Sequence, residues 1–362
     1  MSLTPLQFWT HTTLAIVCFS IPGIASQPVA TEPYADQAVV EKYEETRRHM
    51  RKFGSESAPP KQNGAFRLTT YNIENLFDAN DDPTLTGRDE DIDDTKPEHQ
   101  LIATAMAIHA INPDVITFQE IESEQALLEY RDNYLSDMGY DYIVSIDAGN
   151  SRGIENAILS RFPISHYENW PNKPLGGVHP ERYGDSKNWY AGEPIAFRRS
   201  PLRVDLQIPT TDPTSTGEST WTLTLFIMHH KSGRYNTYWR EAEATGTLAL
   251  INTVIEEDPN RPIVILGDFN AEPNATSVQT YLKAGFVDIF EDHTKNDQIP
   301  THESGRRIDL ILANQPALDH MDTENAFVFG TAARPEGTSW RDLDSFEGYA
   351  SDHYPVSVDL TK

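Results

Sequence analysis

Short strand-like runs alternate with helical stretches from Phe66 almost to the C-terminus, and this alternation constrains the fold more than any other feature of the chain. Seven apolar runs are predicted as strands: Phe66–Asn72, Asp114–Ile121, Asn156–Ser160, Trp221–His230, Pro262–Leu266, Ile308–Leu312 and Tyr354–Leu360. Four stretches are predicted as helices: Glu98–Ile111, Glu124–Leu135, Tyr238–Glu256 and Ser277–Lys283. Strands mixed with helices in this way indicate one large α/β domain rather than two small ones.

Several of these strands end in, or carry, a polar residue that a packed strand would not favour. The residues concerned are Asn72, Glu120, His229 with His230, Asp268 with Asn270, Asp309, and Asp352 with His353. Ligands of α/β sheets collect at strand ends, so the repetition of polar residues there indicates one shared site.

Each polar residue also has a simpler explanation. Asn72 could form a turn, Glu120 could be a solvated carboxylate, and Gly267–Asn270 could be a tight turn. Asp309 is harder to explain in this way, because a charge inside a run of Ile and Leu needs a partner if it is buried. These explanations, applied residue by residue, do not account for the occurrence of so many polar residues in or after the predicted strands of one chain.

Together these residues resemble the endonuclease/exonuclease/phosphatase superfamily, which includes pancreatic-type deoxyribonucleases, abasic-site endonucleases, neutral sphingomyelinases and inositol-polyphosphate phosphatases. The resemblance covers about residues 66–361 and depends mainly on Gly267–Asn270 combined with Ser351–His353, supported by Gln119 and Glu120. It implies a four-layer α/β/β/α sandwich, in which two mixed β-sheets face each other and helices flank both.

The resemblance also implies a cation site. Glu120 matches the family's principal metal-binding carboxylate, and Asn72 and Asp352 would complete or support the site. The chemistry agrees, because attack on an anionic phosphodiester requires charge to be neutralised on its non-bridging oxygens. Oxygen ligands suit a hard cation, so Mg²⁺ is expected, with Mn²⁺ or Ca²⁺ as alternatives.

The catalytic roles follow from the same resemblance. Asp268 matches the residue that orients or deprotonates the attacking water, and Asn270 matches the donor to the scissile phosphate. His353 matches the imidazole set against the phosphate, with Asp309 holding its orientation. His229, rather than the histidine that follows it, matches the first histidine of a His-x-Lys-Ser-like segment.

Three cationic residues are candidates for substrate contacts: Lys231, Arg152 and Arg240. Ordinary surface salt bridges explain them equally well. The segment Tyr167–Arg198 is predicted as a long irregular loop that covers a site, because it is rich in Trp, Tyr, Pro and Gly. Its aromatic residues could stack on bases, touch lipid or simply pin the loop.

The charge balance limits how the chain can meet a polyanion. There are 29 basic and 55 acidic residues, which gives a formal net charge of −26. This acidity argues against a protein that coats nucleic acid, which would need a basic surface. It does not exclude an enzyme that meets phosphate through a bound cation. A lone cysteine, Cys18, excludes an internal disulfide framework and a Cys-ligated zinc site.

The N-terminus contains an apolar run, Leu14–Ile21, which is too short to span a membrane and suits a secretory signal. Residues 1–25 lack Lys and Arg, so an ordinary apolar tail is the alternative. The expected organisation is a signal peptide at 1–25, a charged helix and linker at 26–64, and a catalytic domain at 65–362. Such a protein would be secreted or periplasmic, with no stable membrane insertion and no predicted protein partner.

These observations favour a Mg²⁺-dependent phosphodiesterase in which a metal- and base-activated water attacks the phosphate, with nucleic acid as the first candidate substrate. A sphingomyelinase-like lipid phosphodiesterase or a phosphomonoesterase could use the same core. A catalytically silent adhesion or calcium-binding module is disfavoured, because every residue that the chemistry needs is present.

Overall fold

Two six-stranded mixed β-sheets face each other in the computed structural model, which describes residues 37–83, 85, 95–210, 219–291, 299–338 and 348–361. All described residues fall within one compact unit, Glu32–Lys362. The N-terminal run expected to be a signal peptide lies outside the described residues.

The first sheet has the strand order β15-β16-β1-β2-β4-β3, and the second has the order β13-β14-β12-β11-β10-β5. The first sheet consists of β1 (Ala65–Leu76), β2 (Val115–Ile121), β3 (Tyr142–Ser145), β4 (Glu155–Ser160), β15 (Met321–Val328) and β16 (Val356–Thr361). The second consists of β5 (Ile164–Asn169), β10 (Leu202–Pro209), β11 (Thr220–His229), β12 (Ile263–Asp268), β13 (Val287–Asp288) and β14 (Asp309–Ala313). The central pairs β1–β2 and β11–β12 are parallel, and the remaining pairs are antiparallel.

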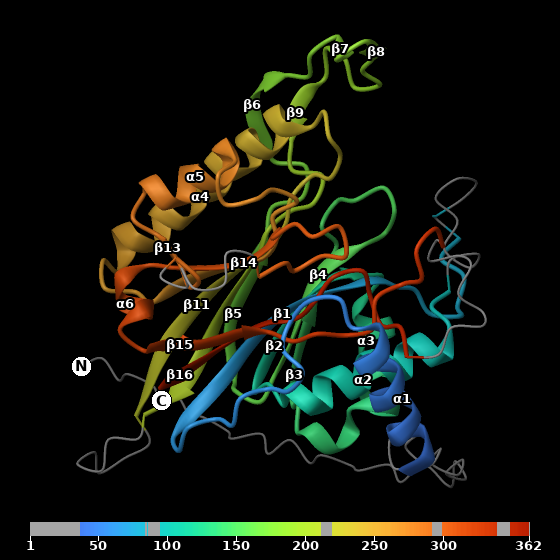
Figure 1. Ribbon diagram of the computed structural model, residues 1–362. Coiled ribbons are helices and arrows are strands. Elements are labelled where there is room, and N and C mark those ends of the chain that lie inside the picture. The colour runs from blue at the N-terminus through green and yellow to red at the C-terminus, as the bar shows by residue number, and fades with distance from the viewer. Residues whose placement is uncertain are drawn as a thin grey trace, which may run out of the picture. The chain divides into compact units, whose positions relative to one another are not determined.

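Apolar side chains fill the space between the sheets because each strand alternates its faces. Leu68 of β1 and Leu266 of β12 belong to this inner core, whereas their near neighbours Tyr71 and Ile265 pack outward under helices. The outer helices are α2 (Glu98–Ile111) and α3 (Glu124–Tyr134) on the first sheet, and α4 (Thr237–Glu257) and α5 (Thr276–Lys283) on the second. Figure 1 shows these helices on opposite sides of the two sheets. The predicted four-layer sandwich is confirmed.

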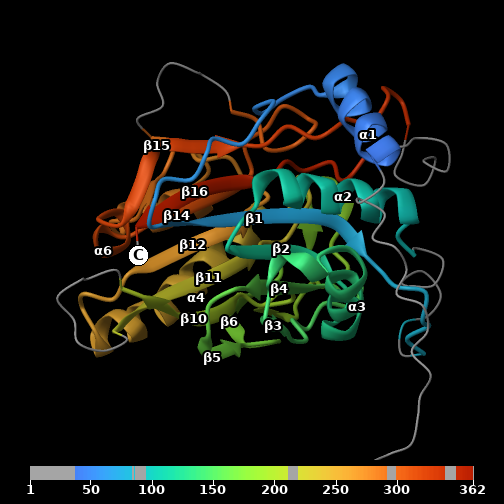
Figure 2. The ribbon, with the colours of Figure 1, turned by 90° about the horizontal axis from the view of Figure 1, so that it is seen from below.

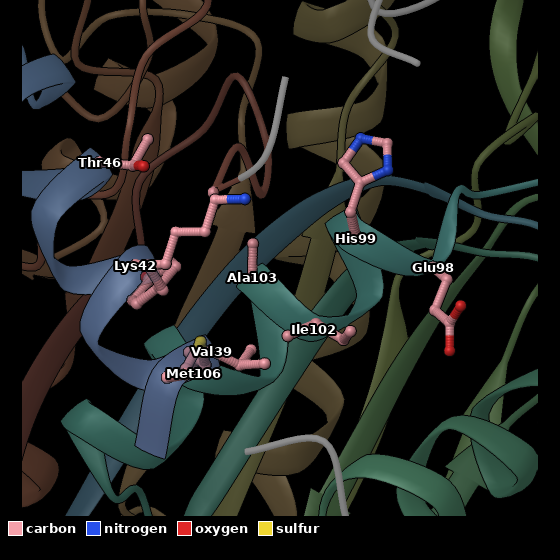
Figure 3. Close-up of a pocket in the computed structure, with 11 residues that line it drawn as sticks. Val39, Lys42, Thr46, Glu98, His99, Ile102, Ala103 and Met106 are labelled. Atoms are coloured by element: carbon pink, nitrogen blue, oxygen red, sulfur yellow. The ribbon is translucent and has the colours of Figure 1, made fainter. Parts of the chain in front are cut away.

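The charged helix expected near the start of the chain is α1 (Gln37–Met50), which lies beside α2 on the outside of the sandwich (Figure 2). Tyr43 packs against Ala103 and Met106 of α2. The two helices leave a hollow of about 400 Å³, whose mainly apolar lining appears in Figure 3. Residues 55–64, expected as a linker, are tied to the sheets by bonds such as Lys61 Nζ to Asp114 Oδ2 at 2.6 Å.

The predicted strands and helices are found close to their expected bounds, but the expectation for Tyr167–Arg198 is wrong. Instead of an irregular loop, the segment contains the end of β5 and two short ribbons, which we call the arm (residues 174–196). The arm pairs β6 (Pro174–Val178) with β9 (Pro194–Ala196), and β7 (Arg182–Tyr183) with β8 (Ser186–Lys187). These strands are too short, and too interrupted by glycines such as Gly176 at φ +83°, to show alternation in sequence. Figure 1 shows β7 and β8 at the tip of the arm.

A buried ion pair links β1 to β16 in the first sheet. Arg67 and Asp359 are register partners, and the two side chains form hydrogen bonds of 2.7 and 2.9 Å. Arg67 also donates to the carbonyls of Ile111 and Pro59. Both charged side chains are almost completely buried, so each depends on the other for compensation.

We expect Arg67→Met to lower the free energy of unfolding by about 3–5 kcal/mol, because it leaves the Asp359 carboxylate buried without its partner. The double variant Arg67→Met/Asp359→Leu removes both charges and should be more stable than the single variant. Urea unfolding curves for the wild type, Arg67→Met, Asp359→Leu and the double variant measure the coupling. A double variant as unstable as the sum of the two singles would contradict the interpretation.

Candidate active site

The predicted site residues of the second sheet lie side by side at one end of three adjacent strands. His229 of β11 is in register with Asp268 of β12, and Asp268 is in register with Asp309 of β14. These residues continue the inward-facing alternation of their strands, so polar side chains replace the apolar core at this end. Gly267 permits the arrangement: its φ is +133°, and a Cβ there would lie 2.1 Å from the Met228 carbonyl oxygen.

The first sheet contributes the opposite wall of the site. Asn72, four residues before the end of β1, is in register with Gln119 of β2. Its Nδ2 donates to Oδ2 of Asp268 at 3.3 Å. This bond joins the two sheets. Glu120, the residue after Gln119, has a φ of +69°. This left-handed conformation is unusual for a residue other than glycine. Backbone strain of this kind is concentrated at functional sites, where it aims a side chain.

His353 is held by Asp309 and faces Asp268. Its Nδ1 lies 2.9 and 2.8 Å from the two carboxylate oxygens of Asp309, and its Nε2 lies 4.0 Å from Oδ2 of Asp268. Burial acts to lower the pKa of His353, but the carboxylates of Asp309 and Asp352 outweigh it and hold the pKa well above its usual value. The imidazole is therefore a cation near neutral pH, with Nε2 available as a donor.

Asn270 and Asp268 form a compact unit beside the imidazole. The backbone N–H of Asn270 donates to Oδ1 of Asp268 at 2.7 Å, and its amide donates to Oδ2 at 2.9 Å and to the His230 carbonyl at 3.1 Å. Asn270 has a φ of +48°. Burial raises the pKa of Asp268 to about 6, with His353 acting in the opposite direction.

The two adjacent histidines have different surroundings, as expected from their phase along the strand. Nε2 of His229 lies 3.6 Å from both Glu120 Oε1 and Asp268 Oδ2. Burial and the Arg199 guanidinium lower the pKa of His229 well below its usual value, so it is neutral and accepts from Arg199. His230 points away from the site and packs against Phe269, and burial lowers its pKa to about 3.

A second group of charges surrounds Asp352. Arg334 bonds to Glu74 at 3.0 Å and to Asp352 at 3.2 Å, and Nε2 of His302 lies 3.3 Å from Asp352. Burial, and then the nearby Asp352, raise the pKa of Glu74 to about 7. A carboxylate whose pKa is raised by a neighbouring carboxylate lies close to like charge.

Two groups of these side chains could hold a metal ion. Asp268, Asp309 and His353 offer ligand atoms within 4.8 Å of one another, as do His302, Asp352 and His353. The donors of the two groups are carboxylate oxygens and imidazole nitrogens, and hard divalent cations favour the carboxylate oxygens. A cation among them would offset the negative charge of the carboxylates. Of the ligands that the family resemblance implies, Asp352 belongs to one of these groups, and Glu120 belongs to neither.

The predicted substrate contacts occupy two different settings. Arg152 donates to Asn75 Oδ1 at 2.7 Å and, with Lys231, lines a hollow beside the site. Arg240 is buried and donates to the carbonyls of Lys231 and Gly233 at 3.0 Å. It therefore supports the loop that carries Lys231.

Four residues of the site were not singled out from the sequence: Glu74, Arg199, His302 and Arg334. Arg199 contacts His229 from the segment just before β10. The adjacent pair Arg198-Arg199 ahead of a strand is the one local feature of the sequence that points to this arginine. Glu74 lies two residues after the predicted strand Phe66–Asn72, and no feature of the sequence marks its side chain. His302 and Arg334 come from connecting segments without a periodic pattern.

An α/β/β/α sandwich with carboxylates, amides and imidazoles gathered at one end of its two sheets is the architecture of a phosphoester hydrolase. The model of the endonuclease/exonuclease/phosphatase family matches residues 69–353, and the chain belongs to this family. Its members are phosphoester hydrolases. No curated protein sequence matches the chain.

Solved structures with similar folds include enzymes of several kinds. The human Nocturnin catalytic domain is 14% identical, with 87% of this chain and 98% of that chain covered and a TM-score of 0.49. Truncated TDP2 of Caenorhabditis elegans is 16% identical, with 84% and 100% covered and a TM-score of 0.49. A mannosyl-6-phosphatase of Bacteroides thetaiotaomicron is 16% identical, with 82% and 100% covered and a TM-score of 0.49. Among the residues described, no helix has the length and apolar character needed to cross a membrane.

Glu243 anchors the loop that carries Lys231. Its Oε2 accepts from the Lys231 backbone N–H at 2.8 Å, and this carboxyl group lies on the buried face of α4. Burial raises the pKa of Glu243 to about 7, against a usual value of 4.5. Between these two pH values the unfolded chain loses a proton that the folded chain keeps, so this group lowers stability as the pH rises.

We expect Glu243→Gln to raise the melting temperature at pH 8 more than at pH 4.5. A glutamine can still accept the Lys231 bond but has no charge to bury, and the difference corresponds to an unfolding free energy on the order of 3 kcal/mol. Glu256→Gln, on the exposed side of the same helix, is the control. An equal effect of Glu243→Gln at both pH values would show that Glu243 is not the titrating group.

Proposed function

We propose that this protein is a divalent-metal-dependent phosphodiesterase that hydrolyses nucleic acid. The observation that carries the proposal is the joint position of Asp268, Asn270 and the Asp309–His353 pair opposite Asn72 and Glu120, within a family of phosphoester hydrolases. Each side chain has a role in the hydrolysis of a phosphodiester.

Asp268 is proposed to accept the proton of the attacking water. Its pKa of about 6, raised mainly by burial, keeps it ionised at neutral pH while leaving it basic enough to take a proton. Protonated His353, fixed by Asp309, is proposed to donate from Nε2 to the phosphate as negative charge builds there. Asn270 would exchange its bond to Asp268 for one to a phosphate oxygen.

Glu120, Asn72 and Asp352 are proposed to hold the cation, with Mg²⁺ as the expected ion because of their oxygen donors. When bound there, such an ion neutralises charge on the non-bridging oxygens of the phosphate. Asp352 suits this role because it stays ionised. Burial acts to raise its pKa, but His353 and His302 outweigh burial and hold the pKa below its usual value.

The direct test is hydrolysis by the purified protein of single-stranded DNA, duplex DNA, RNA, sphingomyelin and inositol phosphates. Each substrate is assayed with Mg²⁺ and again with a chelator. Mg²⁺-dependent cleavage of a nucleic acid supports the proposal. Cleavage of only sphingomyelin or only phosphomonoesters would replace it with one of the alternatives that share the core.

We expect Asp268→Asn to lower turnover by about 10³-fold, because the amide keeps the shape of the side chain but cannot accept the proton. Substrate binding should change much less. Turnover is measured under saturating Mg²⁺, and the melting curve checks that the variant is folded. Asp288→Asn, which changes another buried aspartate of the second sheet, is the matched control. A folded Asp268→Asn protein with more than about a tenth of wild-type turnover would contradict the assignment of the base.

We expect Glu120→Gln to raise the Mg²⁺ concentration that gives half-maximal activity, since a neutral amide is a weaker ligand for a hard cation. Activity is measured over a Mg²⁺ titration for the variant and for Glu129→Gln, a change of a half-buried carboxylate on α3. An unchanged titration would remove Glu120 from the set of metal ligands.

A further inference from the structure

A strongly basic pocket opens beside the candidate active site. This basic pocket has a volume of about 580 Å³ and is lined by four cationic residues, Arg152, Arg199, Lys231 and Arg234, and by no carboxylate among the described residues. The chain as a whole carries a net charge of −26, so a carboxylate-free concentration of cations stands out against the rest of the molecule. Cations gathered in a concave site attract anions and can bind phosphate oxygens.

The basic pocket is connected to the residues proposed to act on the phosphate. Arg199 is buried and lines the basic pocket. Its Nη1 contacts Nε2 of His229, and it also contacts the His230 carbonyl at 3.3 Å. His229 in turn lies 3.6 Å from Asp268. A phosphate seated near Asp268 therefore has the basic pocket as its neighbour, which is where the next anionic group of an extended substrate would lie.

Aromatic side chains from two separate segments line the same pocket. Trp189 belongs to the arm and is 91% exposed, and Tyr235 belongs to the loop after β11 and is 56% exposed. The arm approaches this loop, because a Cβ built on Gly184 would lie 3.3 Å from the Tyr235 ring. Exposed aromatic rings beside cations form a platform on which planar bases stack while the cations bind the backbone.

We infer that the basic pocket is a second subsite, which binds the nucleotide next to the scissile phosphate in a single-stranded nucleic acid. Arg234 and Lys231 bind the phosphate of that nucleotide, and Trp189 and Tyr235 stack on its base. The inference rests on the proposed function and narrows its substrate class. A base in a duplex is already paired and stacked, so only an unpaired strand can use the platform. A choline headgroup, being a cation, is repelled by the pocket.

Kinetics on three substrates separate the two halves of the subsite. The substrates are a single-stranded thymidine oligonucleotide, the same backbone with abasic sites, and methyl p-nitrophenyl phosphate, which has neither a base nor a second phosphate. Trp189→Ala should lower kcat/KM about tenfold on the oligonucleotide and leave the abasic strand nearly unchanged. Arg234→Gln should lower kcat/KM on both strands. Neither variant should alter hydrolysis of the small ester.

Two exposed residues outside the pocket provide matched controls. Tyr167→Ala removes an aromatic ring from β5, and Arg48→Gln removes a cation from α1, and both should behave as wild type on all three substrates. If kcat/KM on the small ester fell as much as kcat/KM on the oligonucleotide, the pocket variants would be shown to damage the catalytic centre. Wild-type kinetics of Trp189→Ala and Arg234→Gln on the oligonucleotide would overturn the subsite.

A binding experiment tests the subsite without catalysis. In the presence of a chelator, the single-stranded oligonucleotide should quench the tryptophan fluorescence of the full-length protein, and the quench should be much smaller in Trp189→Phe. An equal quench in both proteins, or none in the wild type, would overturn the stacking role. If the wild type cleaves none of the three substrates with Mg²⁺, the proposed function fails, and this titration still decides whether the pocket binds a single strand.

Discussion

The face-to-face packing of two β-sheets is the constraint on which the rest of the structure depends. Each central strand must place apolar side chains on its inner face, and Leu68 and Leu266 do so through the middle of the sandwich. At one end the same inward positions carry Asn72 and Asp268, whose side chains meet at 3.3 Å. The register of β11, β12 and β14 then fixes which residues stand beside Asp268. The site is thus the polar end of the core, and its geometry follows from the packing of the apolar part.

Charges buried at that end must compensate one another, because water is largely excluded from them. His353 becomes a cation between Asp309 and Asp352, whereas His229, next to the Arg199 guanidinium, stays neutral. Two imidazoles with the same intrinsic pKa therefore acquire different charge states, His229 through burial and the Arg199 charge, and His353 through its carboxylate neighbours. Compensation is incomplete on the acidic side, where Glu74 and Asp268 have raised pKa values of about 7 and about 6. Burial is the main cause of both shifts and nearby carboxylates add to it, so a cation bound beside these groups would favour their ionised forms.

The sequence supports the prediction of those parts of the fold and site that depend on local pattern. Helical periodicity gives α2 at its observed bounds, and polar residues that break an apolar run identify Asp268 and Asp309. Arg199 could not be predicted in the same way, because its role arises from contact with His229, thirty residues away, and not from its own neighbourhood. The arm was missed for a different reason: strands of two to five residues with glycines carry no readable alternation.

The distribution of charge reconciles an acidic protein with an anionic substrate. With a net charge of −26, the field of the whole molecule repels a polyanion, so binding cannot depend on general electrostatic attraction. Attraction must then be local, and it must be strong enough to act at short range, where ionic screening is least effective. The protonated His353 and the basic pocket around Arg199 supply such local positive charge at adjacent places. Under the function proposed above, a strand binds only where one of its phosphates can enter the site, and the acidic surface elsewhere repels the rest of the polymer.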